Sequence, residues 1–533
     1  MIRKTFRTQS IQKWLAILIP FIFFLFHAFL FRNWIIDDAG ISFVYSRNFA
    51  SGYGLVSQPN MVPVEGYSNF TWVILMVPFF IIDKFNPIIT PKIISLILVL
   101  ASFITIQKIQ EIISTKHIAS TAATLIFLSI NTSFAIWTTS GLENPLYTLL
   151  ILLLLWKILQ FNINRTGQNG NLVIVAIIAS LCALTRPDGA IFFGLFPILL
   201  LTDIPSKRRP IKDTIKLLTL YIGLYTLFFG SYLLFRYVYF SDILPNTYYA
   251  KGGLPTLSSI DWYQKINNLF HNVSISTPLV LGLILISIYL NTDQRDNLHS
   301  TILLTFFLTI LAYFLLPFDW MPEFRFATPF FALFYIYLFS VLGKIVEKIG
   351  SKPGANIFIA SLVLLFAISS IISFSGRTNK FLVQPTVPFT LVAERYLQFD
   401  AYASKLSIEN GSLLAPDLGG TLYYSELKIY DLAGLTDKLI AKNLGIHQNI
   451  FYDYIFETVK PTFIHTHEWW AYAANLDGDE RFRRDYIAID ESLDQWVIDH
   501  LDKKIYSGNY VRKDAIKNNL NVFLEITSQL SED

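Results

Sequence analysis

Two adjacent carboxylates follow the first apolar segment of the chain. Asp37 and Asp38 come shortly after an apolar run at 14–31, and apolar residues between 41 and 49 then recur with the spacing of one helix face. One aspartate could cap that helix and complement its dipole, but capping accounts for only one of the two. Neighbouring carboxylates at a boundary of low dielectric constant repel each other, which raises the proton affinity of one of them. We therefore predict that Asp37 or Asp38 is a general base that takes a proton from a substrate hydroxyl.

Three basic residues stand in short polar motifs that interrupt apolar sequence. Arg186 lies in LTRPDG, Lys251 in SDILPNTYYAKGG and Arg325 in FDWMPEFRF. Cations beside carboxylates could bind a phosphate anion while a hydroxyl is deprotonated nearby, so these three are the predicted phosphate ligands. Other polar residues also interrupt apolar sequence, and each of them alone could be a loop charge or a snorkelling side chain. All of them fall on one predicted side of a membrane, however, which favours a common site. The polar residues predicted to contact substrate are Glu65, Tyr67, Asn69, Glu143, Asp188, Asn246, Tyr248 and Asp319.

The composition indicates that the chain has two parts in different solvents. Of its 533 residues 53% are apolar and only 15% are charged, whereas about a quarter of the residues of a soluble globular protein are charged. Residues 1–376 hold 42 charged residues with a net charge of +10, and residues 377–533 hold 39 with a net charge of −7. We therefore predict a membrane domain over 1–376 and an aqueous domain over 377–533. The scattered charges argue against nucleic acid as a partner, and the single cysteine, Cys182, excludes an internal disulfide.

Twelve apolar runs could form membrane-spanning helices. The first follows four basic residues and lacks a cleavage pattern, so we predict a retained anchor and a cytoplasmic amino terminus. Lys and Arg residues near 157–165, 207–212 and 344–352 predict that these loops are cytoplasmic. Counting the crossings between them then places the polar motifs on the outer side of the membrane. Twelve crossings would place the aqueous domain in the cytoplasm, on the side opposite the polar motifs. We therefore predict that one run, 70–83 or 91–107, is interfacial or re-entrant and does not cross the membrane. About eleven transmembrane helices remain. The runs are 14–31, 70–83, 91–107, 118–136, 144–161, 171–185, 188–202, 215–235, 277–291, 299–317, 326–346 and 355–375.

The segments outside the membrane have their own patterns. Residues 32–69 are too polar to cross a bilayer and too aromatic for a solvated linker, so this loop is predicted to lie along the outer interface. After Gly376, helical patterns alternate with the short apolar segments SLLAP, LKIYDL, FYDYIFETV, TFIHTH and YIAID, which predicts an extracytoplasmic α/β domain. His465 and His467 share one face of a strand, and no third ligand is spaced to complete a metal site. We expect this domain to cover the site in the membrane domain. We also expect its deletion to impair acceptor use more than donor binding.

Several of these motifs resemble those of GT-C integral-membrane glycosyltransferases, especially a bacterial group that includes the mycobacterial terminal arabinofuranosyltransferases. The resembling blocks are DDAGISFVYSRNFASGYGLV, VEGYSNFTW, SGLENPLY, LTRPDG, DILPNTYYAK, FDWMPEFRF and DLAGLTDKLIA. The resemblance implies that Asp37 and Asp38 match the family's catalytic aspartate pair, although Gly40 stands where relatives commonly have an aromatic residue and Asp188 where many have Glu. It further implies transfer of a sugar from a polyprenyl-phosphate donor to a glycan or lipid acceptor on the outer face of the bacterial cytoplasmic membrane.

The predicted reaction uses both kinds of charged residue. Asp37 or Asp38 would take the acceptor proton while Arg186, Lys251 or Arg325 holds the departing lipid phosphate. Carboxylate oxygens also suit Mg²⁺ or Mn²⁺, so a divalent cation could take over part of the basic residues' role. The competing hypothesis is a transporter or flippase of a lipid-linked sugar, since many spans around a cavity suit transport equally well. Transport favours two related halves with helices broken at mid-membrane, and the sequence has no evident internal repeat.

Overall fold

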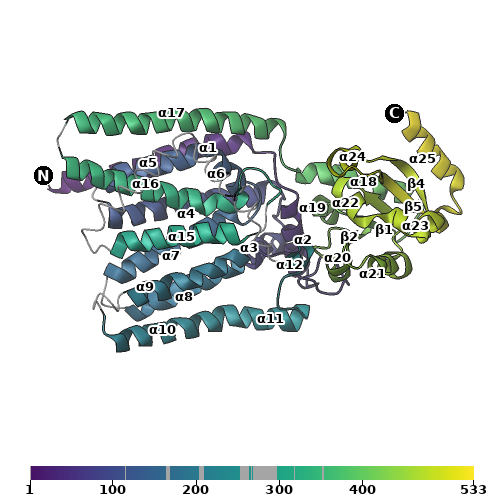
Figure 1. Cartoon of the computed structure of the whole chain (residues 1–533), viewed down its shortest axis with the longest axis horizontal. Helices are drawn as coiled ribbons and strands as arrows, with labels where there is room; N and C mark the ends of the chain where they lie inside the picture. The colour runs from purple at the N-terminus through teal and green to yellow at the C-terminus, as the bar shows by residue number, and fades with distance from the viewer. Residues whose placement is uncertain are drawn as a thin grey trace.

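The computed structural model describes residues 2–114, 116–163, 168–202, 209–252, 263, 265, 267, 297–316, 319–350 and 353–532. Within them the chain forms a bundle of long helices, with a smaller domain of strands and short helices at one end of the bundle and the amino terminus at the other (Figure 1). The predicted architecture of a polytopic helical membrane protein with a carboxyl-terminal α/β domain is therefore confirmed.

The elements of the helical bundle and of the segments beside it follow one another along the chain. They are α1 (Ile2–Leu30), α2 (Asp38–Ala50), α3 (Phe70–Ile81), α4 (Ile89–Ile113), α5 (His117–Ile130), α6 (Thr132–Thr138), α7 (Asn144–Ile163), α8 (Gln168–Thr185), the 3₁₀ helix η1 (Pro187–Gly194), α9 (Leu195–Thr202), α10 (Ile211–Tyr225), the π-helical turn η2 (Thr226–Gly230), α11 (Ser231–Phe240), α12 (Asn246–Ala250), α15 (Asn297–Leu315), the 3₁₀ turn η3 (Arg325–Ala327), α16 (Thr328–Ile349) and α17 (Pro353–Val383).

Eleven of the twelve predicted spans fall on these helices, and 277–291 lies outside the described residues. Six of the described segments are long and apolar enough to cross a membrane, or seven if the bent pair α5 and α6 is one span. Four apolar helices within 70–81, 170–185, 187–202 and 300–315 are shorter than 18 residues. The total of eleven crossings stays a prediction. Of the two weakest candidates, α3 has 12 residues and α4 has 25, so the run at 70–83 is the short one.

Two of the long segments are interrupted, each in a different way. α5 and α6 meet at an angle of 73°, and the side chain of Asn131 between them accepts a hydrogen bond from the backbone N–H of Phe134. This cap starts a new helix in a new direction. α10 and α11 are instead joined through η2, so that Ile211–Phe240 form one 30-residue segment with a π-helical turn.

The helices differ in how much of their apolar surface faces other helices. In α16, 72% of the most apolar stretch is buried, compared with 17% in α17 and 22% in the α10–α11 segment. α16 therefore belongs to the centre of the bundle, and the other two present their apolar side chains to lipid.

The carboxyl-terminal domain contains a mixed five-stranded sheet in the order β2-β1-β3-β5-β4. β1 pairs in parallel with β2 and β3, while β5 is antiparallel to β3 and β4. Its elements are α18 (Phe389–Lys405), β1 (Ser412–Ala415), α19 (Gly419–Tyr424), β2 (Lys428–Asp431), α20 (Lys438–Asn443), α21 (Gln448–Asp453), the π-helical turn η4 (Tyr454–Val459), β3 (Phe463–Thr466), α22 (Glu468–Ala474), η5 (Leu476–Gly478), α23 (Glu480–Asp485), β4 (Tyr486–Leu493), α24 (Gln495–Leu501), β5 (Tyr506–Arg512), η6 (Lys513–Ile516) and α25 (Leu520–Glu532).

Four of the five short segments predicted in this domain are strands, and one is not. FYDYIFETV is helical in α21 and η4, and its buried face of Phe451, Tyr452, Ile455 and Phe456 has the 3.6-residue period of a helix. The sequence analysis also missed β5, whose polar and glycine-containing sequence YSGNYVR carries only a weak strand signal. The predicted domain boundary after Gly376 falls inside α17, which continues to Val383.

The chain segment between α17 and α18 is joined to the loop that precedes α2. Ile36 and Pro388 form an isolated antiparallel bridge, in which Asp37 N–H donates to the carbonyl of Val387 at 3.0 Å and Phe389 N–H to the carbonyl of Ile35 at 2.9 Å. The carboxyl-terminal domain is therefore fastened at the end of the bundle where α2, α3 and α12 lie (Figure 1).

Candidate active site

A cavity of about 240 Å³ opens beside α2, at the end of the bundle next to the carboxyl-terminal domain. Residues from the α2 region, the loop before α3, the turns at 142–143 and 186–188, α12 and η3 all line it. Its wall also contains apolar side chains such as Ile41, Leu244 and Leu315. Nine of the thirteen predicted site residues line this one cavity: Asp38, Tyr67, Asn69, Glu143, Arg186, Asp188, Tyr248, Lys251 and Arg325.

Asp38 is the member of the aspartate pair that reaches the cavity. It is the first residue of α2, and its side chain is 33% exposed. Arg325 lies 3.6 Å from its carboxylate. The carboxylate is thus accessible to a substrate hydroxyl and close to a positive charge, which suits a base that must be ionised before it takes a proton.

Asp37 points away from the cavity, into the carboxyl-terminal domain. Its side chain is buried and accepts hydrogen bonds from the backbone N–H groups of Gly419 at 2.9 Å and Gly420 at 2.7 Å. Burial raises the pKa of Asp37 to about 8 against the opposing effect of these donors, and the charge of Asp38 makes a smaller contribution in the same direction. The expected repulsion between the two carboxylates is present, but burial dominates, and the structure separates the two side chains.

Arg186 is held by two carboxylates at the edge of the cavity. Its guanidinium donates to Glu143 at 3.0 Å and to Asp188 at 2.9 Å. Asn69 donates to the second oxygen of Glu143 at 2.9 Å, so the sequence-distant motifs NFTW, GLEN and LTRPDG meet in one network. Both partners of Arg186 are ionisable acids, so its charge is already compensated.

Arg325 is anchored in a similar way from the opposite side. It donates to both carboxylate oxygens of Asp319, at 3.0 and 3.2 Å, which is the bidentate geometry that a guanidinium favours. Its guanidinium also stacks 4.6 Å from the centre of the Phe326 ring, and Arg186 lies 4.5 Å from the centre of the same ring. Phe326 therefore fixes the positions of both arginines in the cavity wall.

Lys251 is the third cation of the cavity and differs from the arginines. Within the part of the chain that the structure describes, it forms no ion pair. Its side chain is exposed, and the protein around it, together with the positive charge of Arg325, lowers its pKa. An ammonium group that forms no ion pair with the described residues can bind an anion in the cavity without giving up one of them as a partner.

The other three predicted contacts lie behind the cavity wall and support it. Glu65 is buried and bound to Arg236 at 2.6 Å and Tyr232 at 2.6 Å, which ties the interfacial loop to α11. Asn246 donates to the carbonyls of Gly434 and Leu435 and so joins α12 to the carboxyl-terminal domain. Asp319 holds Arg325, as described above.

Several residues of the site escaped the sequence analysis. Ser42 lines the cavity and donates to Asn69 at 3.2 Å, and Leu435 brings the carboxyl-terminal domain into the wall. Gly419 and Gly420 hold Asp37. A pair of glycines directly after a strand and an aspartate, as in SLLAPDLGG, is a signal for a close backbone approach and could have identified them.

The cavity carboxylates are arranged for arginine rather than for a metal ion. Glu143 and Asp188 bind Arg186, and Asp319 and Asp38 face Arg325. Among the residues that the structure describes, no three His, Cys, Asp or Glu side chains form a group that could hold a metal ion. In these positions the carboxylates do not fit a divalent cation, because guanidinium groups already occupy them.

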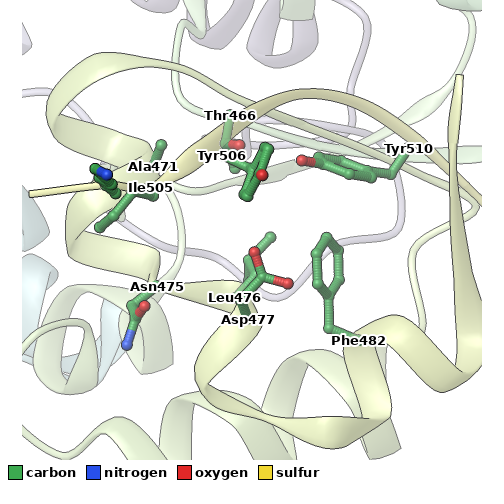
Figure 2. Close-up of a pocket in the computed structure, with 10 residues that line it drawn as sticks. Thr466, Ala471, Asn475, Leu476, Asp477, Phe482, Ile505, Tyr506 and Tyr510 are labelled. Carbon is green, nitrogen blue, oxygen red and sulfur yellow. The ribbon is translucent and has the colours of Figure 1, made fainter. Parts of the chain in front are cut away.

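A second, much smaller pocket lies within the carboxyl-terminal domain. Figure 2 shows Phe482, Tyr506 and Tyr510 around it, with Asp477 at its edge. Its volume of about 60 Å³ has room for water molecules but not for a sugar ring, and none of its residues lines the Asp38 cavity.

Comparison with known proteins identifies the fold. No family model matches the sequence, and no curated protein matches it. Among solved structures, ArnT from Cupriavidus metallidurans in the apo state superimposes with a TM-score of 0.58 and 12% identity over 95% of this chain and 98% of that one. ArnT bound to undecaprenyl phosphate gives 0.56 and 10% over 92% and 97%. The archaeal oligosaccharyltransferase AglB from Archaeoglobus fulgidus, in complex with an inhibitory peptide and a dolichol-phosphate, gives 0.55 and 10% over 85% and 69%. The GT-C fold implied by the sequence motifs is therefore confirmed.

Proposed function

We propose that this protein is a glycosyltransferase that moves a sugar from a polyprenyl-phosphate donor to a cell-envelope acceptor. The observation that carries the proposal is the presence of Asp38 and Lys251 in one cavity with an apolar wall. A carboxylate can take the proton of an acceptor hydroxyl, an ammonium group can bind a phosphate, and apolar side chains suit the first isoprene units of a lipid.

In the proposed reaction, the acceptor oxygen bonds to the anomeric carbon as the bond from that carbon to the phosphate oxygen breaks. Asp38 accepts the hydroxyl proton, and the lipid phosphate leaves with the bonding electron pair. Lys251 and Arg325, which both line the cavity, stabilise the charge that grows on the phosphate. General base catalysis of this kind contributes about 10²–10⁴-fold to a rate.

The ligands of the structural neighbours support a lipid-linked donor. ArnT has been solved with undecaprenyl phosphate and AglB with a dolichol-phosphate, both of which are polyprenyl-type phosphates. We further propose that residues 1–376 act as the catalytic membrane domain and that residues 377–533 cover the site. The active site and the carboxyl-terminal domain then face the outer side of the bacterial cytoplasmic membrane. A donor with a long isoprenoid stays in the bilayer, so its sugar must meet the acceptor at such a surface.

The test is a transfer assay with the purified protein in lipid nanodiscs. A polyprenyl-phosphate sugar labelled in the sugar is incubated with a cell-envelope extract, and label on the acceptor is measured for the wild type and Asp38→Asn. We expect a loss of at least 100-fold in Asp38→Asn. The control is Asp83→Asn, in an exposed loop where the left-handed backbone at φ 52° suits asparagine.

Two results contradict the proposal. One is full activity of Asp38→Asn, which removes the base. The other is movement of intact labelled donor between the leaflets of proteoliposomes without transfer of its sugar, which favours the transporter.

A further inference from the structure

The carboxyl-terminal domain is bound to the start of α2 through Asp37, the residue next to the proposed base. Its carboxylate takes both N–H groups at the start of α19, from Gly419 and Gly420, in a buried position. Its own backbone N–H donates to Val387, and its carbonyl accepts from Gly40 at 2.8 Å in the first turn of α2. All hydrogen-bonding groups of Asp37 therefore form bonds with α2 or with the carboxyl-terminal domain.

The contact between α2 and α19 depends on glycines, because the two backbones nearly touch. A Cβ on Gly40 would lie 2.6 Å from the carbonyl carbon of Gly419. A Cβ on Gly420 would lie 2.5 Å from the carbonyl oxygen of Phe389, the first residue of α18, so this glycine permits the close approach of α19 to α18. A Cβ on Gly419 would collide with the carbonyl of Asp37. Such an approach leaves little freedom for α2 to shift against α19.

The loop that carries the two glycines is itself fixed from the far side. Asp417 accepts hydrogen bonds from Arg395 of α18 at 2.9 Å, and from His467, which follows β3, at 3.1 Å. The hydrogen bond from His467 and the positive charge of Arg395 hold the pKa of Asp417 below its usual value even though burial opposes the shift. A continuous set of contacts therefore runs from the sheet, through Asp417 and the two glycines, to Asp37.

We infer that Asp37 is a positioning residue through which the carboxyl-terminal domain orients Asp38 in the cavity. The two aspartates are consecutive, so the direction of the Asp38 side chain depends on the backbone that Asp37 holds. The inference rests on the proposed function of Asp38 as the base. It gives the carboxyl-terminal domain a part in the rate of transfer, beyond covering the site or binding the acceptor.

The variant that tests this role is Asp37→Asn, with Asp494→Asn as a matched control. An asparagine can accept only one of the two N–H bonds, and its amide group would face the other donor. Asp494 is also 6% exposed and also accepts two backbone N–H groups, from Val497 at 3.1 Å and Glu468 at 2.7 Å, but at α24 and away from α2. Both variants should lower the Tm by similar amounts, so only their catalytic effects differ.

We expect Asp37→Asn to lower kcat about 10- to 100-fold, since a displacement of about 1 Å can cost 10²-fold. The affinity for undecaprenyl phosphate should stay within threefold of the wild type, because Lys251 and Arg325 are untouched. Asp494→Asn should keep kcat within threefold. Hydrogen exchange followed by mass spectrometry should show faster exchange in peptides covering 38–44 and 419–420 of Asp37→Asn only.

If Asp37→Asn does not fold, Asp417→Ala replaces it, because this residue is partly exposed and loosens the same loop from outside. It should lower kcat about 3- to 10-fold with faster exchange at 419–420. Faster exchange with an unchanged kcat, or equal losses of kcat in Asp494→Asn, overturns the positioning role. If the wild type transfers no sugar while exchange at 38–44 still responds to Asp37→Asn, the link between the domains stands and the proposed function fails.

Discussion

Replacing Lys251 by glutamine should weaken the binding of the lipid phosphate without disturbing the cavity. This ammonium is the cavity cation without an ion pair among the described residues, so its removal leaves no carboxylate unpaired. A unit charge about 4 Å from a phosphate is worth at most about 4 kcal/mol at an effective dielectric constant of 20, and measured hydrogen bonds to charged groups contribute about 1.5–3 kcal/mol. We expect the Kd for undecaprenyl phosphate to rise roughly 10- to 100-fold.

The pH dependence provides a second measurement on the same residue. Lys251 binds phosphate in its protonated form, and its pKa lies below the ordinary 10.5. The affinity of the wild type should therefore fall as the pH rises, over a range that begins below 10.5. Lys251→Arg, which stays charged, should abolish this fall.

Native mass spectrometry of the detergent-solubilised protein with undecaprenyl phosphate measures these affinities. Lys108→Gln is the control, because this lysine lies in α4, pairs with Glu111 and does not line the cavity. A Kd for Lys251→Gln within threefold of the wild type, or the same pH dependence in Lys251→Arg, would refute the assignment of Lys251 as the phosphate ligand.

Three further predictions concern the residues around the cavity. Arg325→Lys keeps the charge but loses the bidentate bond to Asp319 and the stacking on Phe326, so transfer should fall about tenfold; an unchanged kcat would contradict the role of this geometry. Glu65→Ala leaves Arg236 without its carboxylate and should destabilise the protein by roughly 2–3 kcal/mol, seen as a lower Tm, with a smaller loss in Glu65→Gln. Because the cavity carboxylates are bound to guanidinium groups, EDTA should change transfer by less than twofold, and restoration of lost activity by added Mg²⁺ or Mn²⁺ would show that this arrangement rearranges around a metal.

The amino-acid pattern was enough to predict the solvent of each part of the chain and to select the polar motifs of the candidate site. Long apolar runs such as 355–375 can be satisfied only as helices in a bilayer, and the tail with a quarter of its residues charged must fold in water. The polar motifs around Asp38, Arg186, Lys251 and Arg325 could be found because charged residues are rare in such a sequence.

The surroundings of each charged residue follow from the folded arrangement and could not be read from the motifs. Asp37 and Asp38 are equivalent in the sequence, and they differ because successive residues at the start of a helix point in directions about 100° apart. One side chain consequently enters the carboxyl-terminal domain, where it meets two N–H groups from residues almost 400 positions away, and the other enters the cavity. The same holds for the arginines, because Arg186 and Arg325 each have one partner from their own motif, Asp188 and Asp319, while helix packing brings Glu143 to Arg186 and Asp38 to Arg325.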